Sequence, residues 1–345
     1  MDTVTDPHDL LREIHDFYTN LYSAESCDES ARSLFLDVDF PKLTEEARAS
    51  CDDRLTEEEL RKVLFSMENN KSPGVDGLSI NFYKHFWPLF SDKLLLVYNH
   101  AFDSGCLSVS QRRGIILLVF KKGDRTLLKN WRPITLLTMD YKILTKALAN
   151  RLQRVLPLII HTHQTASVKG RTINDNVRLL HDVIYYACYC DIPLAVISVD
   201  QLKAFDRFSP DFLFTILDAF DFGPAFTQWI RVLYNSVSSS VLTDGWLTSF
   251  IVLSRGLRQG CALSMPLYVL TAEALAINIR ANSTIHGLLP PGPTDVEVKH
   301  TQFADDTTLL LVNDDSIAEA FDLYERASGA KINKHKCKGL WLHPR

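Results

Sequence analysis

The stretch Phe303-Ala304-Asp305-Asp306-Thr307 places two adjacent carboxylates between two apolar segments, residues 299–303 and 307–312. Apolar segments on both sides of a short polar turn predict a β-hairpin that turns at Ala304-Asp305-Asp306. Adjacent carboxylates repel each other, whereas hard divalent cations such as Mg²⁺ prefer oxygen ligands of this kind. The pair is therefore either a solvated turn or one part of a metal site.

A third carboxylate ends another apolar segment, Val196-Ile197-Ser198-Val199-Asp200. Taken alone, Asp200 is explained equally well as a strand end or a helix cap. If its strand is the sheet neighbour of the hairpin, the three carboxylates form a site for two metal ions about 4 Å apart. Such a site stabilises the attacking and the leaving oxygen in phosphoryl transfer.

The rest of the chain predicts a mixed α and β protein. Its 345 residues suggest two to three domains, and 46% hydrophobic with 23% charged residues exclude wholesale disorder. Pro290-Pro291-Gly292-Pro293 indicates an exposed loop. Hydrophobic periodicity predicts helices near residues 10–21, 56–67, 80–101, 141–156, 211–220, 224–234, 264–280 and 315–328. Outside the 299–312 hairpin, the sequence predicts a buried strand at 114–120, a strand at 194–199, and a second hairpin of 238–242 with 246–253.

The net charge of −5 argues at first sight against a nucleic-acid partner, but the charge is unevenly distributed. Residues 1–65 carry 17 acidic and 7 basic side chains. Residues 111–171 carry 13 Lys and Arg against only Asp124 and Asp140. Because this basic region contains a predicted strand and a predicted helix, it indicates a folded, phosphate-binding surface.

The seven cysteines are scattered and form no C-x-x-C pair, so the sequence predicts neither a disulfide framework nor a zinc ribbon. The N-terminus is acidic where a signal peptide is basic and then apolar. Apolar runs such as residues 114–120 are far shorter than the ~20 residues that span a bilayer. We therefore expect a cytoplasmic or nuclear protein that is neither secreted nor associated with a membrane.

Nine stretches in a fixed order, spread over roughly residues 60–345, resemble one protein family: the reverse transcriptase domain of non-long-terminal-repeat (LINE-type) retrotransposons. The stretches are residues 70–77 (NKSPGVDG), 120–124 (FKKGD), 130–137 (NWRPITLL), 146–152 (KALANRL), 164–176 (QTASVKGRTINDN), 198–207 (SVDQLKAFDR), 256–261 (GLRQGC), 303–306 (FADD) and 329–333 (GAKIN).

The resemblance implies an α+β right-hand polymerase fold. Residues 1–65 would form an acidic helical extension, 66–190 the fingers, and 191–345 the palm, an antiparallel sheet backed by helices. Because the chain ends at Arg345, just after the last palm motif, we expect the thumb to be absent. The implied activity is RNA-directed DNA synthesis, in which dNTPs extend a primer 3′-hydroxyl on an RNA template. The resemblance implies two Mg²⁺ ions as cofactors, with Mn²⁺ as an alternative metal.

The same resemblance assigns roles to individual residues. Asp200, Asp305 and Asp306 match the metal-binding catalytic triad, and Phe205 matches the aromatic residue that excludes a ribose 2′-hydroxyl. The implied contacts of the incoming nucleotide are Lys121, Lys122, Arg132, Gln259 and Gly260. Arg258 and Arg171 are expected to contact template or primer, and either Lys336 or Lys331 is the candidate general acid. Asp206 is interpreted as structural.

Two other interpretations remain. A truncated, inactive remnant would at most bind RNA through residues 111–171, and charge reversal at Arg132, Lys142 and Arg151 would then weaken binding. A metal-dependent nuclease or phosphatase is less well supported, because Phe205 and Gln259-Gly260 are needed only by a site that selects nucleotides. His161-Thr162-His163 is interpreted as a solvated loop and not as a set of metal ligands. The oligomeric state is not predicted.

Overall fold

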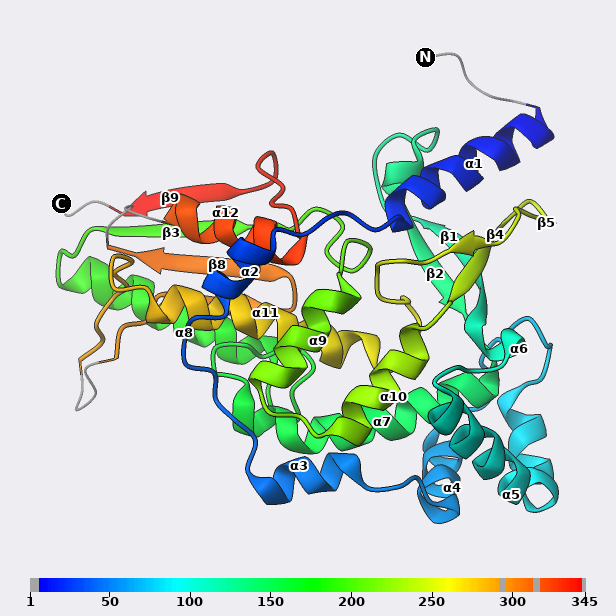
Figure 1. Cartoon of the computed structure of the whole chain (residues 1–345). Coiled ribbons are helices and arrows are strands. Elements are labelled where there is room, and N and C mark those ends of the chain that lie inside the picture. Colours follow the sequence, from blue (N-terminus) through cyan, green and yellow to red (C-terminus); the bar gives the residue numbers. More distant parts are fainter. Residues whose placement is uncertain (1–5, 292–295, 313–316, 343–345) are drawn as a thin grey trace. The chain divides into compact units, whose positions relative to one another are not determined.

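The computed structural model describes residues 6–291, 296–312 and 317–342 (Figure 1). The chain divides into two compact units that alternate along the sequence. The first unit comprises Met1–Ala24, Glu45–Leu152 and Phe222–Ser264, and the second comprises Glu25–Thr44, Gln153–Asp221 and Met265–Arg345. The predicted functional division at residues 65 and 190 stays a prediction, because these units are defined by packing and not by role.

The first unit contains a sheet in the order β2-β1-β4-β5, with β6 paired to β4. Its strands are β1 (Arg113–Phe120), β2 (Trp131–Leu136), β4 (Ser238–Thr243), β5 (Trp246–Leu247) and β6 (Ile251–Val252). β1 and β2 form an antiparallel pair in which Phe120 lies opposite Trp131. β1 and β4 are parallel, with Ile116 opposite Val241.

Helix α1 (Pro7–Tyr22) covers one face of this sheet. Its buried side chains Ile14, Tyr18 and Tyr22 pack in one cluster with Ile116 and Val241. The helix begins where Asp6 accepts hydrogen bonds from the main-chain N–H groups of the first turn. The N-terminal segment is thus part of the core of the first unit.

Helices make up the rest of the first unit: α3 (Glu45–Asp52), α4 (Glu57–Ser66), α5 (Ile80–Ser104), α6 (Val109–Arg112), the 3₁₀ helix η1 (Leu128–Asn130), most of α7 (Met139–Ile159) and α10 (Pro224–Tyr234). Arg151 of α7 is buried and pairs with both carboxylate oxygens of Glu59 in α4, at 2.8 and 2.7 Å. Arg151 therefore belongs to the core and not to the basic surface that the sequence predicted.

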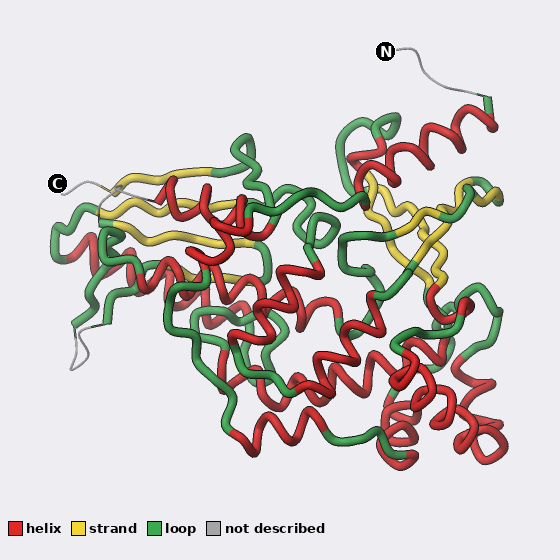
Figure 2. The backbone as a smooth tube through the Cα atoms, in the orientation of Figure 1, coloured by secondary structure: helices red, strands yellow, loops and turns green. Residues whose placement is uncertain are grey.

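The second unit contains a fully antiparallel sheet in the order β7-β8-β3-β9 (Figure 2). Its strands are β7 (His300–Phe303), β8 (Asp306–Leu311), β3 (Leu194–Val199) and β9 (Lys338–Leu342). The helices of this unit are α2 (Glu29–Phe35), α8 (Ile173–Tyr189), α9 (Pro210–Ala219), α11 (Ser264–Ala281, apart from its first residue) and α12 (Ile317–Ser328). Val183 and Ala187 of α8 pack in one cluster with Leu194 and Leu310 of the sheet. The α+β class and the helix-backed antiparallel sheet predicted for the palm are confirmed.

Several predicted elements differ from those observed. The basic helix does not stop at Pro157 but continues through it to Ile159. Strand β1 is not fully buried, because Val119 is 49% exposed. The second half of the 238–253 hairpin is split into β5 and β6. The expected start of α12 and half of the Pro290–Pro293 loop lie outside the described residues.

His161-Thr162-His163 is not a solvated loop as predicted. Only Thr162 is exposed, and the rings of His161 and His163 lie 6.4 and 5.9 Å from that of the buried His300. Within the described ranges, none of the helices is long and apolar enough to cross a membrane.

Candidate active site

The three candidate carboxylates lie at one end of two neighbouring strands. Asp200 directly follows β3, and Asp306 is the first residue of β8. β3 and β8 are paired in antiparallel register with Val199 opposite Thr307, so Asp200 and Asp306 come from the same end of the pair. Asp305 lies in the two-residue turn between β7 and β8. The condition that the sequence left open, that these strands are neighbours, is met.

A buried glutamine holds the turn that carries Asp305. Gln164 accepts a hydrogen bond from the main-chain N–H of Ala304 at 3.1 Å, and its amide donates to the Ala304 carbonyl at 3.4 Å. Ala304 has a φ of +57°, a left-handed conformation that needs such support in a residue other than glycine. Asn176 donates to the carbonyl of Gln302, in β7 two residues before Ala304, at 2.6 Å. The sequence placed Gln164 and Asn176 in a family-like stretch but assigned them no role.

Asp200 is held by the segment that follows α12. Its carbonyl accepts from the N–H of Asn333 at 2.8 Å, and its Oδ1 accepts from the Asn333 amide at 3.0 Å. The Nζ of Lys336 lies 3.3 and 3.4 Å from the two carboxylate oxygens. Lys331, the other candidate general acid, instead pairs with Glu325 at 3.4 Å. The structure therefore places Lys336, and not Lys331, beside Asp200. The sequence placed Asn333 in a family-like stretch but assigned it no role.

Phe205 lies in the loop that links β3 to α9, and its ring stacks on that of Tyr268 in α11. The ring centroids are 4.8 Å apart and the planes differ by 19°. Burial raises the pKa of Tyr268 well above its usual value, and the charges of Asp305 and Asp306 raise it further. Phe205 is thus held against α11 by its stacking on a buried tyrosine.

The chemistry of this site suits a divalent cation, because three carboxylates supply hard oxygen ligands. As the side chains stand, no three His, Cys, Asp or Glu residues in the described part of the chain converge closely enough to enclose an ion. The positive charge next to Asp200 comes from Lys336. The oxygen atoms of these carboxylates are suitable ligands for Mg²⁺. To bind one ion together, the three side chains would have to move closer to each other.

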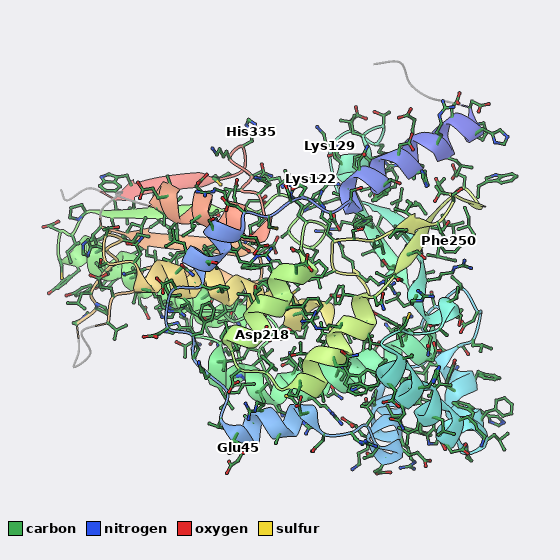
Figure 3. The ribbon with its side chains drawn as sticks, in the orientation of Figure 1. Glu45, Lys122, Lys129, Asp218, Phe250 and His335 are labelled. Carbon is green, nitrogen blue, oxygen red and sulfur yellow. The ribbon has the colours of Figure 1, made fainter. Side chains whose placement is uncertain are left out.

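The predicted phosphate-binding residues lie together on the first unit. Arg132 in β2 lies opposite Val119 in β1. Beyond the last paired residues of these strands, the N–H of Lys121 donates to the Asn130 carbonyl at 3.0 Å, so the antiparallel pairing extends to Lys121. Lys121, Lys122 and Arg132 are all exposed. Figure 3 labels Lys122 together with Lys129, another exposed cation of the same β1–β2 connection. One hairpin end therefore concentrates positive charge.

Gln259 and Gly260 lie against the strand that carries Arg132. The Gln259 carbonyl accepts from the N–H of Thr135 at 2.7 Å. Gly260 has a φ of +115°, and a Cβ at this position would lie 2.6 Å from the Thr135 carbonyl oxygen. Only glycine permits this approach of the two main chains.

Arg258 and Arg171 were both predicted to contact template or primer. Arg258 is 7% exposed, donates to the Arg112 carbonyl, and lies 5.1 Å from the centre of the Tyr141 ring. Arg171 donates to the carbonyls of Ile160, His161 and Gln164 at 2.6 to 2.8 Å. Their geometry favours structural roles, so neither is proposed below as a nucleic-acid contact.

Comparison with known proteins identifies relatives. Residues 119–343 match the family described as reverse transcriptase (RNA-dependent DNA polymerase). The Xenopus laevis "Transposon TX1 uncharacterized 149 kDa protein" is 38% identical over 97% of this chain and 26% of its own length. The "RNA-directed DNA polymerase from mobile element jockey" of Drosophila funebris is 24% identical over 84% of this chain and 32% of its own length. The chain thus spans about a quarter to a third of these relatives.

A solved structure of apo telomerase from Candida tropicalis, truncated from its C-terminal domain, is 14% identical, with a TM-score of 0.47 over 75% of this chain and 56% of that one. The family match covers well over half of the chain. The chain therefore belongs to the reverse transcriptase (RNA-dependent DNA polymerase) family, as a domain of the LINE type that its retrotransposon relatives carry.

Proposed function

We propose that this chain copies RNA into DNA by adding dNTPs to the 3′-hydroxyl of a DNA primer, as part of a retrotransposon protein. The observation that carries the proposal is the set of three carboxylates at one end of the β3–β8 pair. We further propose that it acts in the cytoplasm or nucleus, and its seven free cysteines fit a reducing compartment.

Reverse transcriptases generally use divalent metal ions. In this proposal Asp200, Asp305 and Asp306 hold two Mg²⁺ ions. Ions bound there would neutralise charge on the attacking and leaving oxygens of phosphoryl transfer. The chain's own contribution is to fix the ligands, because Gln164 holds the turn of Asp305 and Asn333 orients the Asp200 carboxylate.

The exposed cations Lys121, Lys122 and Arg132 are proposed to bind the triphosphate of the incoming dNTP. Guanidinium and ammonium groups stabilise phosphate charge as it develops in the transition state. Gln259 and Gly260 support this function by fixing the strand of Arg132. Phe205 is proposed to select deoxyribose over ribose. Lys336 is proposed as the general acid that protonates the pyrophosphate leaving group, because its ammonium group lies next to Asp200.

An inactive remnant that only binds RNA is not favoured. All three carboxylates are present, their strands are paired, and the turn and strand end that carry them are held by Gln164 and Asn333. Charge reversal at Arg151 does not probe RNA binding by a surface. Arg151 is 3% exposed and paired with Glu59, so reversing its charge would unfold the first unit instead of removing a surface contact.

The proposal is tested by primer extension on an RNA template with the purified chain, comparing wild type with Asp305→Asn. We expect Mg²⁺-dependent extension that falls by at least ~10²-fold in the variant, because a charge-stabilising ligand is lost. Asp182→Asn, which changes an exposed carboxylate on α8, is the matched control and should retain full activity. Equal extension by Asp305→Asn, or no Mg²⁺-dependent product from wild type, would disprove the proposal.

A further inference from the structure

The loop between β3 and α9, residues 200–209, contains Phe205 but no regular secondary structure. Its first part is fixed through the main chain, because the Leu202 N–H donates to the Lys331 carbonyl at 2.7 Å. Its end is fixed by Ser209, whose hydroxyl caps α9. The middle turns at Lys203, which has a φ of +50°. Main-chain hydrogen bonds close this turn, because the Asp206 and Arg207 N–H groups both donate to the Lys203 carbonyl, at 2.9 and 3.0 Å. The turn carries Phe205, so any contact that holds the turn on the rest of the unit also positions Phe205.

Packing beneath the loop is incomplete. A cavity of ≈ 20 Å³, enough for about one water molecule, is lined by Ala204, Arg207 and Phe208 of the loop and by Tyr268 of α11. Tyr268 is the residue on which Phe205 stacks. Because a void provides no van der Waals contacts on its side, polar contacts of the loop add to the stacking of Phe205 and the burial of Phe208 in fixing its position.

One such contact comes from the N-terminal part of the chain. The Nη2 of Arg207 donates to both carboxylate oxygens of Glu25, at 2.9 and 2.6 Å. The Arg207 side chain is 15% exposed and that of Glu25 is 43% exposed, so the pair is partly shielded from water. Glu25 lies outside residues 119–343, the part of the chain that matches the reverse transcriptase family.

The segment that carries Glu25 is itself anchored to the second unit. Asp28 caps α2 and pairs with Arg326 of α12 at 2.7 Å. Phe35, at the end of α2, packs against Phe212 of α9 and Tyr324 of α12, with ring centroids 5.8 and 5.7 Å apart. Glu25 lies three residues before Asp28, the residue that anchors the start of α2, so its position is restrained and its ion pair can restrain the loop.

We propose that Glu25 is a positioning residue for nucleotide selection: its ion pair with Arg207 fixes the 200–209 loop and so holds Phe205 where it discriminates deoxyribose from ribose. This inference rests on the proposed function, since it assigns Phe205 its role in sugar selection. It gives the N-terminal segment a part in substrate specificity although that segment contributes none of the proposed site residues.

The test compares wild type with Glu25→Gln in two measurements. Hydrogen–deuterium exchange of the peptide spanning residues 200–209 should be faster in the variant. The ratio of kcat/KM for dNTP to that for the matching rNTP should fall by about tenfold, because small displacements of a positioning group have effects of this order. Combining Glu25→Arg with Arg207→Glu restores the ion pair in reverse and should recover most of both losses.

Glu29→Gln is the matched control, because it removes another ion pair of the same segment, with Arg32, without touching the loop. It should leave exchange and sugar discrimination unchanged. Unchanged exchange and discrimination in Glu25→Gln, or equal changes in Glu29→Gln, would overturn the inference. Wild type without primer extension would instead refute the proposed function, and the exchange measurement alone would then decide whether Glu25 fixes the loop.

Discussion

Gly260 connects the geometry of one residue to the position of a whole strand. Its φ of +115° is a conformation that side chains disfavour, and its α-carbon faces the Thr135 carbonyl. Thr135 lies three residues from Arg132 in β2. Any side chain at residue 260 would therefore push against the main chain of the strand that presents Arg132.

Replacing Gly260 by Ala should lower the free energy of unfolding by about 2–5 kcal/mol, since backbone strain adds to overpacking. Gly245→Ala is the matched control, because Gly245 also has a positive φ, +84°, but no atom lies within 4 Å of its added Cβ. The control variant should lower the free energy of unfolding by only about 1–2 kcal/mol. Urea denaturation measures both, and equal losses would show that Gly260 is not needed for close approach.

At the scale of elements, α1 and α2 show that the acidic N-terminal segment is structural. α1 supplies buried side chains to the sheet of the first unit, and α2 packs on α12 in the second unit. These two acidic helices therefore each fold against a core. The sequence predicted a helical extension but not that its parts belong to different units.

Ile14 of α1 is 2% exposed, and Ile14→Ala should lower the free energy of unfolding by about 2–4 kcal/mol, the usual range for emptying a core site. Leu34→Ala, at a position of α2 that is 61% exposed, should cost less than about 0.5 kcal/mol. Denaturant unfolding of the full chain measures the difference. If α1 were only a tethered linker, both variants would be neutral.

At the scale of the whole molecule, stability should depend on a cluster of histidines in the second unit. Burial, together with the charge of Arg280, lowers the pKa of His161 to about 3 and that of His163 to about 4. The same causes hold the pKa of the fully buried His300 well below its ordinary value of 6.5. These imidazoles are neutral in the folded chain at a pH where the unfolded chain would bind protons.

Because the folded pKa values are depressed, the stabilisation is fully present above pH ~6.5 and is lost as the pH falls towards 4. We expect the free energy of unfolding to be lower at pH 5 than at pH 7, with a contribution from the fully buried His300 and smaller ones from the two partly exposed rings. His163→Asn should reduce this dependence, whereas His181→Asn, at an exposed position, should not. An identical pH dependence in wild type and His163→Asn would contradict this account.

The sequence by itself determined most of the individual elements. β3 and α10 have the predicted limits, and the predicted hairpin is present, although its turn is Ala304 and Asp305 and does not include Asp306. These features depend on apolar periodicity and turn residues, which are local properties of the chain. The ordered stretches also indicated the family, because each is recognisable without knowledge of the fold.

Only the tertiary structure decided which distant segments meet. Asp200 and Lys336 are 136 residues apart, and Glu25 and Arg207 are 182 apart, so no local pattern could choose Lys336 over Lys331 or find Glu25. The burial of Arg151 and Arg258 likewise follows from the elements that surround them, and a basic run in the sequence looks the same whether its side chains are solvated or buried. The reason is physical: periodicity and turn chemistry act between near neighbours, whereas burial and ion pairing depend on packing that the whole chain completes.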